Sequence, residues 1–289
     1  RPVPVFTPTA HRALAGYTWT RHRLVLNVLD DVRNRIEVAE PPTGPGGDWH
    51  VTTPTELPDV WTFDVSAVDA DTCDDVWLVA NDFLTPESLY LVPVGAEAGP
   101  PALVRQAPAR FDADGLAITQ HVATSADGTR VPYFEVSRGG DPRPTLLGGY
   151  GGFEVPRLPT YAPALGRAWL EAGGTYVLAN IRGGGEYGPR WHQAGLRENR
   201  PRVYEDFEAV ARDLIDRGVT TADRLGCTGG SNGGLLVGNM YVRSPELWGA
   251  IVCQVPLLDM RRYHLLLAGA AWMAEYGDPD DPDDWAFMQ

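Results

Sequence analysis

The chain of 289 residues is long enough for one large domain or two ordinary ones, and 44% of its residues are hydrophobic, which is enough for a packed core. Its formal net charge of −14 argues against a nucleic-acid partner, because a phosphate backbone attracts a basic surface. No apolar run approaches the roughly 18 residues that a membrane span needs, so no membrane partner is expected.

The cysteine and lysine content excludes further classes of site. Cys73, Cys227 and Cys253 are odd in number and widely spaced, which fits neither a disulfide framework nor a zinc site. They indicate free thiols in a reducing compartment, and we expect a cytoplasmic location. All 24 basic residues are arginine, so this segment has no P-loop lysine, Schiff-base lysine or Ser-Lys dyad. We expect no cofactor and no metal.

Residues 1–111 are expected to form an all-β segment. Strands at 23–29 and 35–38 flank an Asp30-Asp31 turn, which is a hairpin pattern. Further short strands are predicted between turns rich in Asp, Pro and Gly, at 60–65, 75–80 and 88–94. Such a series is typical of a sandwich, a barrel or a propeller, and the pattern does not choose among them. The Pro/Ala-rich segment 102–115 is expected to be an irregular crossing into a second domain, residues 112–289.

The second domain begins with a predicted hairpin, in which strands at 118–123 and 130–136 flank Asp127-Gly128. From residue 144 onward, strands and helices alternate. Strands are predicted at 145–147, 176–179, 224–228 and 250–253, and helices at 161–172, 204–217 and 232–242. This alternation predicts an α/β domain whose parallel sheet is covered by helices on both faces.

The strongest chemical signal is Gly229-Gly230-Ser231-Asn232-Gly233-Gly234, which contains G-x-S-x-G between a predicted strand and a predicted helix. This is the context of a nucleophile elbow, where a sharp turn exposes the serine hydroxyl at the end of the sheet. Flanking glycines are needed because a Cβ would not fit. The turn would also aim the backbone N–H of Asn232 at a developing oxyanion.

Two further glycine-rich segments follow predicted strands. Gly148-Gly149-Tyr150-Gly151-Gly152-Phe153 would place Tyr150 at the carboxyl end of the sheet, where its hydroxyl could donate to an oxyanion. Ala179-Asn180-Ile181-Arg182-Gly183-Gly184-Gly185-Glu186-Tyr187-Gly188 suggests a tight loop held by charge pairing near the site.

These three segments, in this order and spacing, resemble the catalytic domain of the prolyl oligopeptidase family, and the likeness covers residues 112–289. Asn232 separates the chain from dipeptidyl peptidase IV relatives, which have Tyr there, and from oligopeptidase B, which has Ala. The resemblance implies that Ser231 is the nucleophile, and that the Tyr150 hydroxyl and the Asn232 amide form the oxyanion hole. It further implies that a substrate proline stacks on Trp272, in a pocket lined by Phe153 and Tyr276.

The resemblance also implies the fold: an α/β-hydrolase domain at 112–289, preceded at 1–111 by the last blades of a β-propeller. One departure concerns Gly269-Ala270-Ala271-Trp272, where better-known members have His before Ala-Trp. The α/β-hydrolase order is Ser, then acid, then His. His264 is the one histidine after Ser231, and it precedes any acid of suitable topology. We therefore expect the catalytic Asp and His beyond residue 289, and we interpret the chain as a fragment truncated at both ends and inactive alone.

The sequence predicts a serine-type endopeptidase or oligopeptidase. Its substrates would be short peptides, cleaved on the carboxyl side of proline through a Ser231 acyl-enzyme. Two alternatives stay open: an esterase on the same fold, and a catalytically inactive hydrolase-fold binding module. The acidic run at 278–284 lacks the Gly and terminal Glu of a calcium loop, and we interpret it as a solvated turn.

Overall fold

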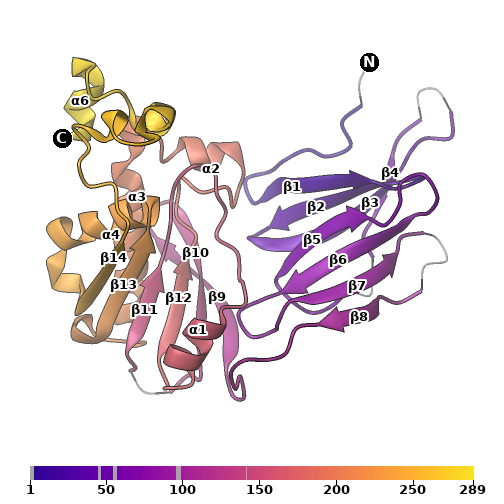
Figure 1. Cartoon of the computed structure of the whole chain (residues 1–289), viewed down its shortest axis with the longest axis horizontal. Helices are drawn as coiled ribbons and strands as arrows, with labels where there is room; N and C mark the ends of the chain where they lie inside the picture. Colours follow the sequence, from indigo (N-terminus) through magenta and orange to yellow (C-terminus); the bar gives the residue numbers. More distant parts are fainter. Residues whose placement is uncertain (1–2, 45–46, 55–56, 96–98, 141) are drawn as a thin grey trace. The chain divides into compact units, whose positions relative to one another are not determined.

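The structure is a computed structural model that describes residues 3–44, 47–54, 57–95, 99–140 and 142–289 (Figure 1). The chain divides into two compact units. One comprises the residues up to Phe111 together with Leu158–Pro163, and the other comprises Asp112–Arg157 and Ala164–Gln289. The sequence pattern does not predict that residues 158–163 belong to the first unit. Nowhere in the described residues is a helix long and apolar enough to cross a membrane.

The first unit consists of two four-stranded antiparallel sheets, each a meander of sequential strands. The first sheet holds β1 (Arg12–Trp19), β2 (Leu24–Asp30), β3 (Arg33–Glu40) and β4 (His50–Thr52). The second holds β5 (Thr62–Ala67), β6 (Asp75–Asn81), β7 (Ser88–Pro93) and β8 (Ala102–Gln106). Each sheet has the form of a propeller blade, as the family resemblance implies.

Three of these strands were missed from the sequence, and the segment 102–115 is not irregular throughout, because it contains β8. All residues of β4 and β8 are exposed, so neither strand shows the alternation of apolar and polar residues that a half-buried strand requires. In β1 a single residue, Ala13, is fully buried. The β2–β3 hairpin forms as predicted, but its turn lies at Asp31 and Val32, both at positive φ.

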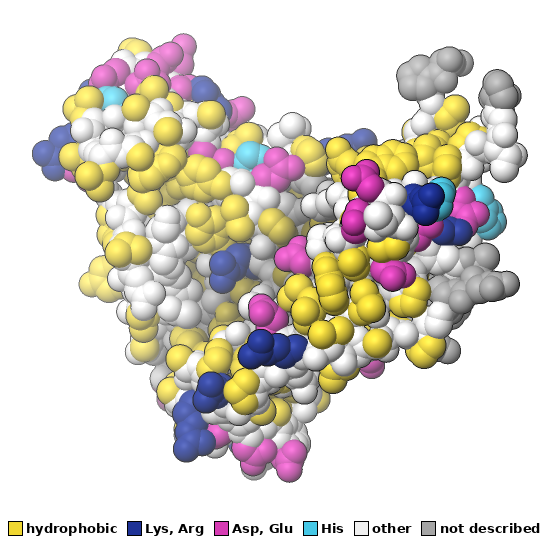
Figure 2. Space-filling model, turned by 45° about the vertical axis from the view of Figure 1, so that its right-hand side comes forward, with side chains coloured by type: hydrophobic (Ala, Val, Ile, Leu, Met, Phe, Trp, Pro, Cys, Tyr) yellow, Lys and Arg dark blue, Asp and Glu magenta, His cyan; other side chains and the backbone are white. Residues whose placement is uncertain are grey.

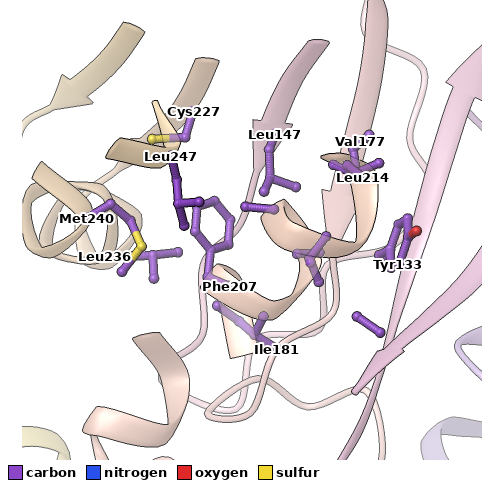
Figure 3. Packing of buried hydrophobic residues seen from close by; sticks show 14 of the residues in the cluster. Tyr133, Leu147, Val177, Ile181, Phe207, Leu214, Cys227, Leu236, Met240 and Leu247 are labelled. Atoms are coloured by element: carbon purple, nitrogen blue, oxygen red, sulfur yellow. The ribbon is translucent and has the colours of Figure 1, made fainter. Parts of the chain in front are cut away.

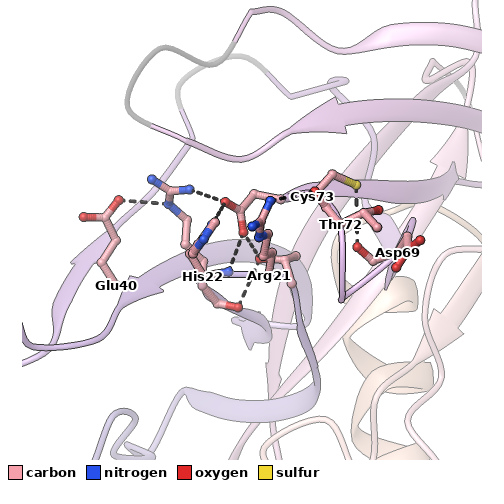
Figure 4. Close-up of polar contacts among 9 residues, drawn as sticks. Arg21, His22, Glu40, Asp69, Thr72 and Cys73 are labelled. Atoms are coloured by element: carbon pink, nitrogen blue, oxygen red, sulfur yellow. Dashed lines mark hydrogen bonds and ion pairs between the residues drawn. The ribbon is translucent and has the colours of Figure 1, made fainter.

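A polar cluster around Asp74 ties the turn after β1 to the segment before β6 (Figure 4). The carboxylate of Asp74 accepts hydrogen bonds from the Thr20 hydroxyl (2.7 Å), the His22 backbone N–H (2.7 Å) and the Arg23 guanidinium (2.9 Å). Burial opposes its ionisation, but the hydrogen bonds outweigh burial and lower the pKa of Asp74 to about 2. The two sheets are thus joined by a fully ionised carboxylate as well as by apolar packing.

The second unit is built on a six-stranded sheet in the order β14-β13-β11-β12-β10-β9. Its strands are β9 (Ala117–Thr124), β10 (Arg130–Ser137), β11 (Thr145–Gly148), β12 (Thr175–Ala179), β13 (Leu225–Gly230) and β14 (Ala250–Gln254). The last four are parallel, whereas β10 pairs antiparallel with both β9 and β12. The predicted α/β class is confirmed, but the sheet is mixed rather than wholly parallel, because the predicted hairpin 118–136 belongs to it.

Six α-helices accompany this sheet. In the described chain they are α1 (Pro163–Leu165), α2 (Pro189–Gln193), α3 (Pro201–Asp216), α4 (Asn232–Arg243), α5 (Met273–Tyr276) and α6 (Pro282–Met288). The helix predicted at 161–172 is shorter than expected, since α1 continues as a π-helix that ends at Leu170. Short 3₁₀ segments include Arg197–Asn199, Tyr263–Leu265 and Gly269–Trp272.

The core of the second unit lies between the sheet and the pair α3 and α4. The ring of Phe207, from α3, is fully buried and occupies the centre of the cluster in Figure 3. It is surrounded by side chains of the sheet, such as Leu147 and Cys227, and by Leu236 of α4. Each such side chain contributes about 1.5–3 kcal/mol on burial. This packing fixes α4 against the carboxyl end of β13, where Ser231 lies.

Candidate active site

Ser231 lies at the junction between β13 and α4, in the strand–turn–helix context that the sequence predicts. Its backbone has φ 58° and ψ −118°, a left-handed φ that is unfavourable for a residue with a side chain. The conformation is held by a hydrogen bond from the Ser231 N–H to the carbonyl of Gln254, the last residue of β14 (3.1 Å). The serine side chain is exposed. A strained, exposed serine at the end of a parallel strand is the geometry of a nucleophile elbow.

The glycines around Ser231 are required by close backbone approaches. A Cβ on Gly229 would overlap the carbonyl oxygen of Gly233 within the turn. A Cβ on Gly233 would lie 2.8 Å from the carbonyl oxygen of Gly149. The elbow therefore packs directly against the loop that follows β11, which carries Tyr150.

Asn232 connects the elbow to that loop through its side chain. Its amide Nδ2 donates a hydrogen bond to the carbonyl of Tyr150, and only 1% of the residue is exposed. The backbone N–H of Asn232 lies in the first turn of α4, where helix geometry supplies no intrahelical acceptor. The half-buried Tyr150 has the Arg157 guanidinium 5.9 Å from its ring centroid. The two predicted oxyanion donors thus come from segments that are bonded to one another.

The three predicted pocket residues belong to one apolar cluster. Phe153 and Trp272 are half-buried, and Tyr276 is only 3% exposed. The rings of Phe153 and Tyr276 meet edge to face with centroids 5.7 Å apart. The Tyr276 hydroxyl donates to Oδ1 of Asn232 (2.7 Å), and burial raises its pKa. Tyr276 therefore offers little surface to a ligand, and its visible action is to fix the Asn232 side chain.

Sequence reasoning missed a buried charged pair beside this cluster. Arg200 and Glu275 are 8% and 4% exposed, and the guanidinium donates to the carboxylate at 2.7 Å. His192 of α2 also contacts Glu275, with Nε2 at 2.7 Å from Oε2. The one sequence signal was the position of Glu275 between Trp272 and Tyr276, in an otherwise apolar stretch.

The loop after β12 is held by charge, but its two charged residues do not pair with one another. The Arg182 guanidinium forms an ion pair with Asp206 of α3 and with Asp127 of the β9–β10 turn. Glu186 is 1% exposed and accepts a hydrogen bond from the Arg157 N–H (2.9 Å). Burial of its carboxyl group raises the pKa of Glu186 to about 7.

The acidic run at 278–284 is not wholly solvated. Asp284 is 8% exposed and forms an ion pair with Arg197, while Asp280 accepts a hydrogen bond from Nε2 of His264 (3.1 Å). Figure 2 shows acidic side chains gathered near the end of the second unit where Figure 1 draws α6. Within the described residues, no histidine is hydrogen-bonded to Ser231 Oγ. His264 is bonded to Asp280 instead.

A strained serine elbow on a mainly parallel sheet with flanking helices defines the second unit as an α/β-hydrolase domain. Comparison with known proteins identifies the family, because residues 164–288 match the model of the prolyl oligopeptidase family. The chain belongs to this family of serine peptidases.

Similar proteins extend the likeness over almost the whole chain. An uncharacterized peptidase of Sinorhizobium fredii is 48% identical over 292 residues, which cover 100% of this chain and 39% of the relative. A prolyl endopeptidase of Elizabethkingia miricola is 35% identical over 70% of this chain and 29% of its own length. A solved post-proline cleaving enzyme from Rickettsia typhi superposes with a TM-score of 0.87 at 35% identity, over 98% of this chain and 41% of that one. The chain thus spans well under half the length of these relatives.

Proposed function

We propose that this chain carries the nucleophile and the oxyanion hole of a serine peptidase that cleaves short peptides on the carboxyl side of proline. The observation that carries the proposal is the strained, exposed Ser231, bonded through its neighbour Asn232 to the Tyr150 loop. The chemistry of such a site is acyl transfer. Ser231 Oγ would attack the scissile carbonyl carbon, and the Tyr150 hydroxyl and the Asn232 N–H would stabilise the oxyanion.

Collapse of the tetrahedral intermediate would expel the amine and leave an acyl-enzyme on Ser231, which water then hydrolyses. The attack needs a base to take the Oγ proton. Since no described histidine is bonded to Ser231, we expect the base to come from a part of the full-length protein other than the described residues. The chain alone would then be inactive.

The preference for proline is proposed from Trp272. Its half-buried side chain packs, like that of Phe153, against the apolar cluster of Leu235, Tyr263 and Tyr276, and part of it stays accessible. A proline ring stacked on an indole face gains about 0.5–1.5 kcal/mol beyond the burial of area. In support, the solved relative from Rickettsia typhi is named a post-proline cleaving enzyme. We also propose that residues 1–111 are the propeller segment and 112–289 the peptidase segment of this chain.

The test uses the full-length protein, a fluorophosphonate probe and paired Gly-Pro p-nitroanilide and p-nitrophenyl ester substrates. We expect Ser231→Ala to abolish labelling and amide turnover. Ser244→Ala, at the other end of α4, is the matched control and should preserve both. Labelling that survives in Ser231→Ala would reject Ser231 as the nucleophile. Turnover of the ester without the amide would favour an esterase.

A further inference from the structure

The loop between β11 and α1 adopts an unfavourable backbone conformation beside the elbow. Gly151, Phe153 and Glu154 have φ values of 65°, 58° and 55°. For residues with side chains, a left-handed conformation is unfavourable because the Cβ atom lies too close to the following carbonyl oxygen. Such a conformation persists only where surrounding groups over-determine it.

Three side chains from three different elements bind its backbone. Asn232 of α4 donates to the carbonyl of Tyr150. Arg200, just before α3, donates to the carbonyl of Gly151 at 2.6 Å. Glu275 of α5 accepts from the N–H of Phe153 at 3.0 Å. The loop is therefore fixed at almost every residue from Tyr150 to Phe153.

Glu275 is the junction of these supports. Its Oε1 accepts from both the Phe153 N–H and the Arg200 guanidinium, and its Oε2 contacts Nε2 of His192. Both Glu275 and Arg200 are buried, so removal of one charge would leave the other without its counter-charge in a poorly solvated site. Arg200 would then no longer be held in place to reach Gly151.

The same short segment also carries the proposed substrate platform. Trp272 ends the 3₁₀ turn that leads directly into α5. Tyr276, the residue after Glu275, donates to Oδ1 of Asn232 and has the Arg200 guanidinium 5.0 Å from its ring centroid. Residues 272–276 thus include Trp272 itself and also contact Asn232 of the elbow and the backbone of the Tyr150–Phe153 loop.

We propose that Glu275 is a positioning residue: it locks the Tyr150–Phe153 loop and so sets the direction of the Tyr150 hydroxyl relative to Ser231. This inference rests on the proposed function. Glu275 itself would touch neither substrate nor the reacting atoms. A small displacement of a catalytic group can cost on the order of 10² in rate, so the effect should appear in kcat.

The test compares Glu275→Gln with Glu135→Gln in the full-length protein. Glu135 is a close match on β10, since it is 8% exposed and contacts Arg217 (3.2 Å) and His121 (3.3 Å). We expect Glu275→Gln to lower kcat about 10- to 100-fold, with KM changed by less than about 3-fold. Glu135→Gln should stay within about 3-fold of wild type in both. Equal kcat losses in the two variants would overturn the proposal.

A double-mutant cycle tests whether Glu275 acts through Tyr150. In a Tyr150→Phe background, Glu275→Gln should lower kcat by no more than about 3-fold further, because the displaced hydroxyl is already absent. Multiplication of the two single losses would show that Glu275 acts by another route. Arg200→Lys provides a second variant: it keeps the charge but loses the fork that reaches both Gly151 and Glu275, and it should reproduce the kcat loss.

Amide hydrogen exchange separates this proposal from the proposed function. Exchange over residues 149–154 should accelerate in Glu275→Gln and not in Glu135→Gln. If wild-type protein lacked peptidase activity and Ser231 labelling, the proposed function would fail, while the exchange result would still decide whether Glu275 holds the loop. Unchanged exchange in Glu275→Gln would refute the positioning role.

Discussion

Replacement of Glu186 by Gln should stabilise the protein at alkaline pH. Glu186 lies in the loop that follows β12. This loop contacts the loop that carries Tyr150, because the Glu154 N–H donates to the carbonyl of Gly183 (3.2 Å). One carboxyl oxygen accepts from the Arg157 N–H, and the other is buried without a hydrogen-bond partner within the described structure. Burial dominates, so the pKa of Glu186 rises from an ordinary 4.5 to about 7.

The sign of the effect follows from proton linkage. Below pH 4.5 the carboxyl group is protonated in both the folded and the unfolded state, and folding loses nothing to its ionisation. Between pH 4.5 and 7 the unfolded chain ionises more readily, and stability falls. Above pH 7 the loss is complete. The interval from 4.5 to about 7 corresponds to roughly 3 kcal/mol.

The assay is urea unfolding of wild type and Glu186→Gln at pH 4, 6 and 8. At pH 4 the two should be equally stable, or the variant slightly weaker, because its amide N–H finds no new acceptor. At pH 8 the variant should be more stable by about 2–3 kcal/mol. Glu135→Gln, which breaks an ion pair with Arg217, should instead lose stability at pH 8. A difference between wild type and Glu186→Gln that does not change from pH 4 to 8 would refute the reasoning.

Three further predictions concern the site. Tyr150→Phe in the full-length protein should lower kcat by on the order of 10²–10³ with little change in KM, since its hydroxyl acts on the transition state; an unchanged kcat would make it a loop residue only. Trp272→Ala should raise KM for Gly-Pro substrates more than for Gly-Ala substrates, and equal losses would reject the stacking platform. Residues 1–289 alone should show no turnover above a Ser231→Ala control, because a serine without its base is a weak nucleophile; turnover like that of the full-length protein would place the base within these residues.

The sequence predicted the elbow because its determinants are local. Ser231 is identified by glycines within a few residues and by the flanking strand and helix, and all of these occur as expected. Strands with buried apolar residues were also predicted, such as β2, which is buried on both faces, and β6, which is buried on one. Strands β4 and β8 were not, because burial pattern is the signal and these strands bury nothing.

The supports of the site are non-local, and this is why they escaped prediction. Phe153 and Glu275 are 122 residues apart, and Gly151 and Arg200 are 49 apart. In the sequence a Glu in an apolar stretch can be solvated or buried, and the two cases look the same. The two cases differ in the folded protein, because a buried carboxylate must accept hydrogen bonds. Each of these hydrogen bonds then fixes the chain segment that carries the donor. The conformation of Ser231 is therefore encoded by residues next to it in the chain, whereas the side chains that hold the Tyr150–Phe153 loop come from 49 to 122 residues away from the backbone groups they bind. We therefore expect variants at Arg200, His192 or Glu275 to lower kcat, although none of these side chains would touch the substrate.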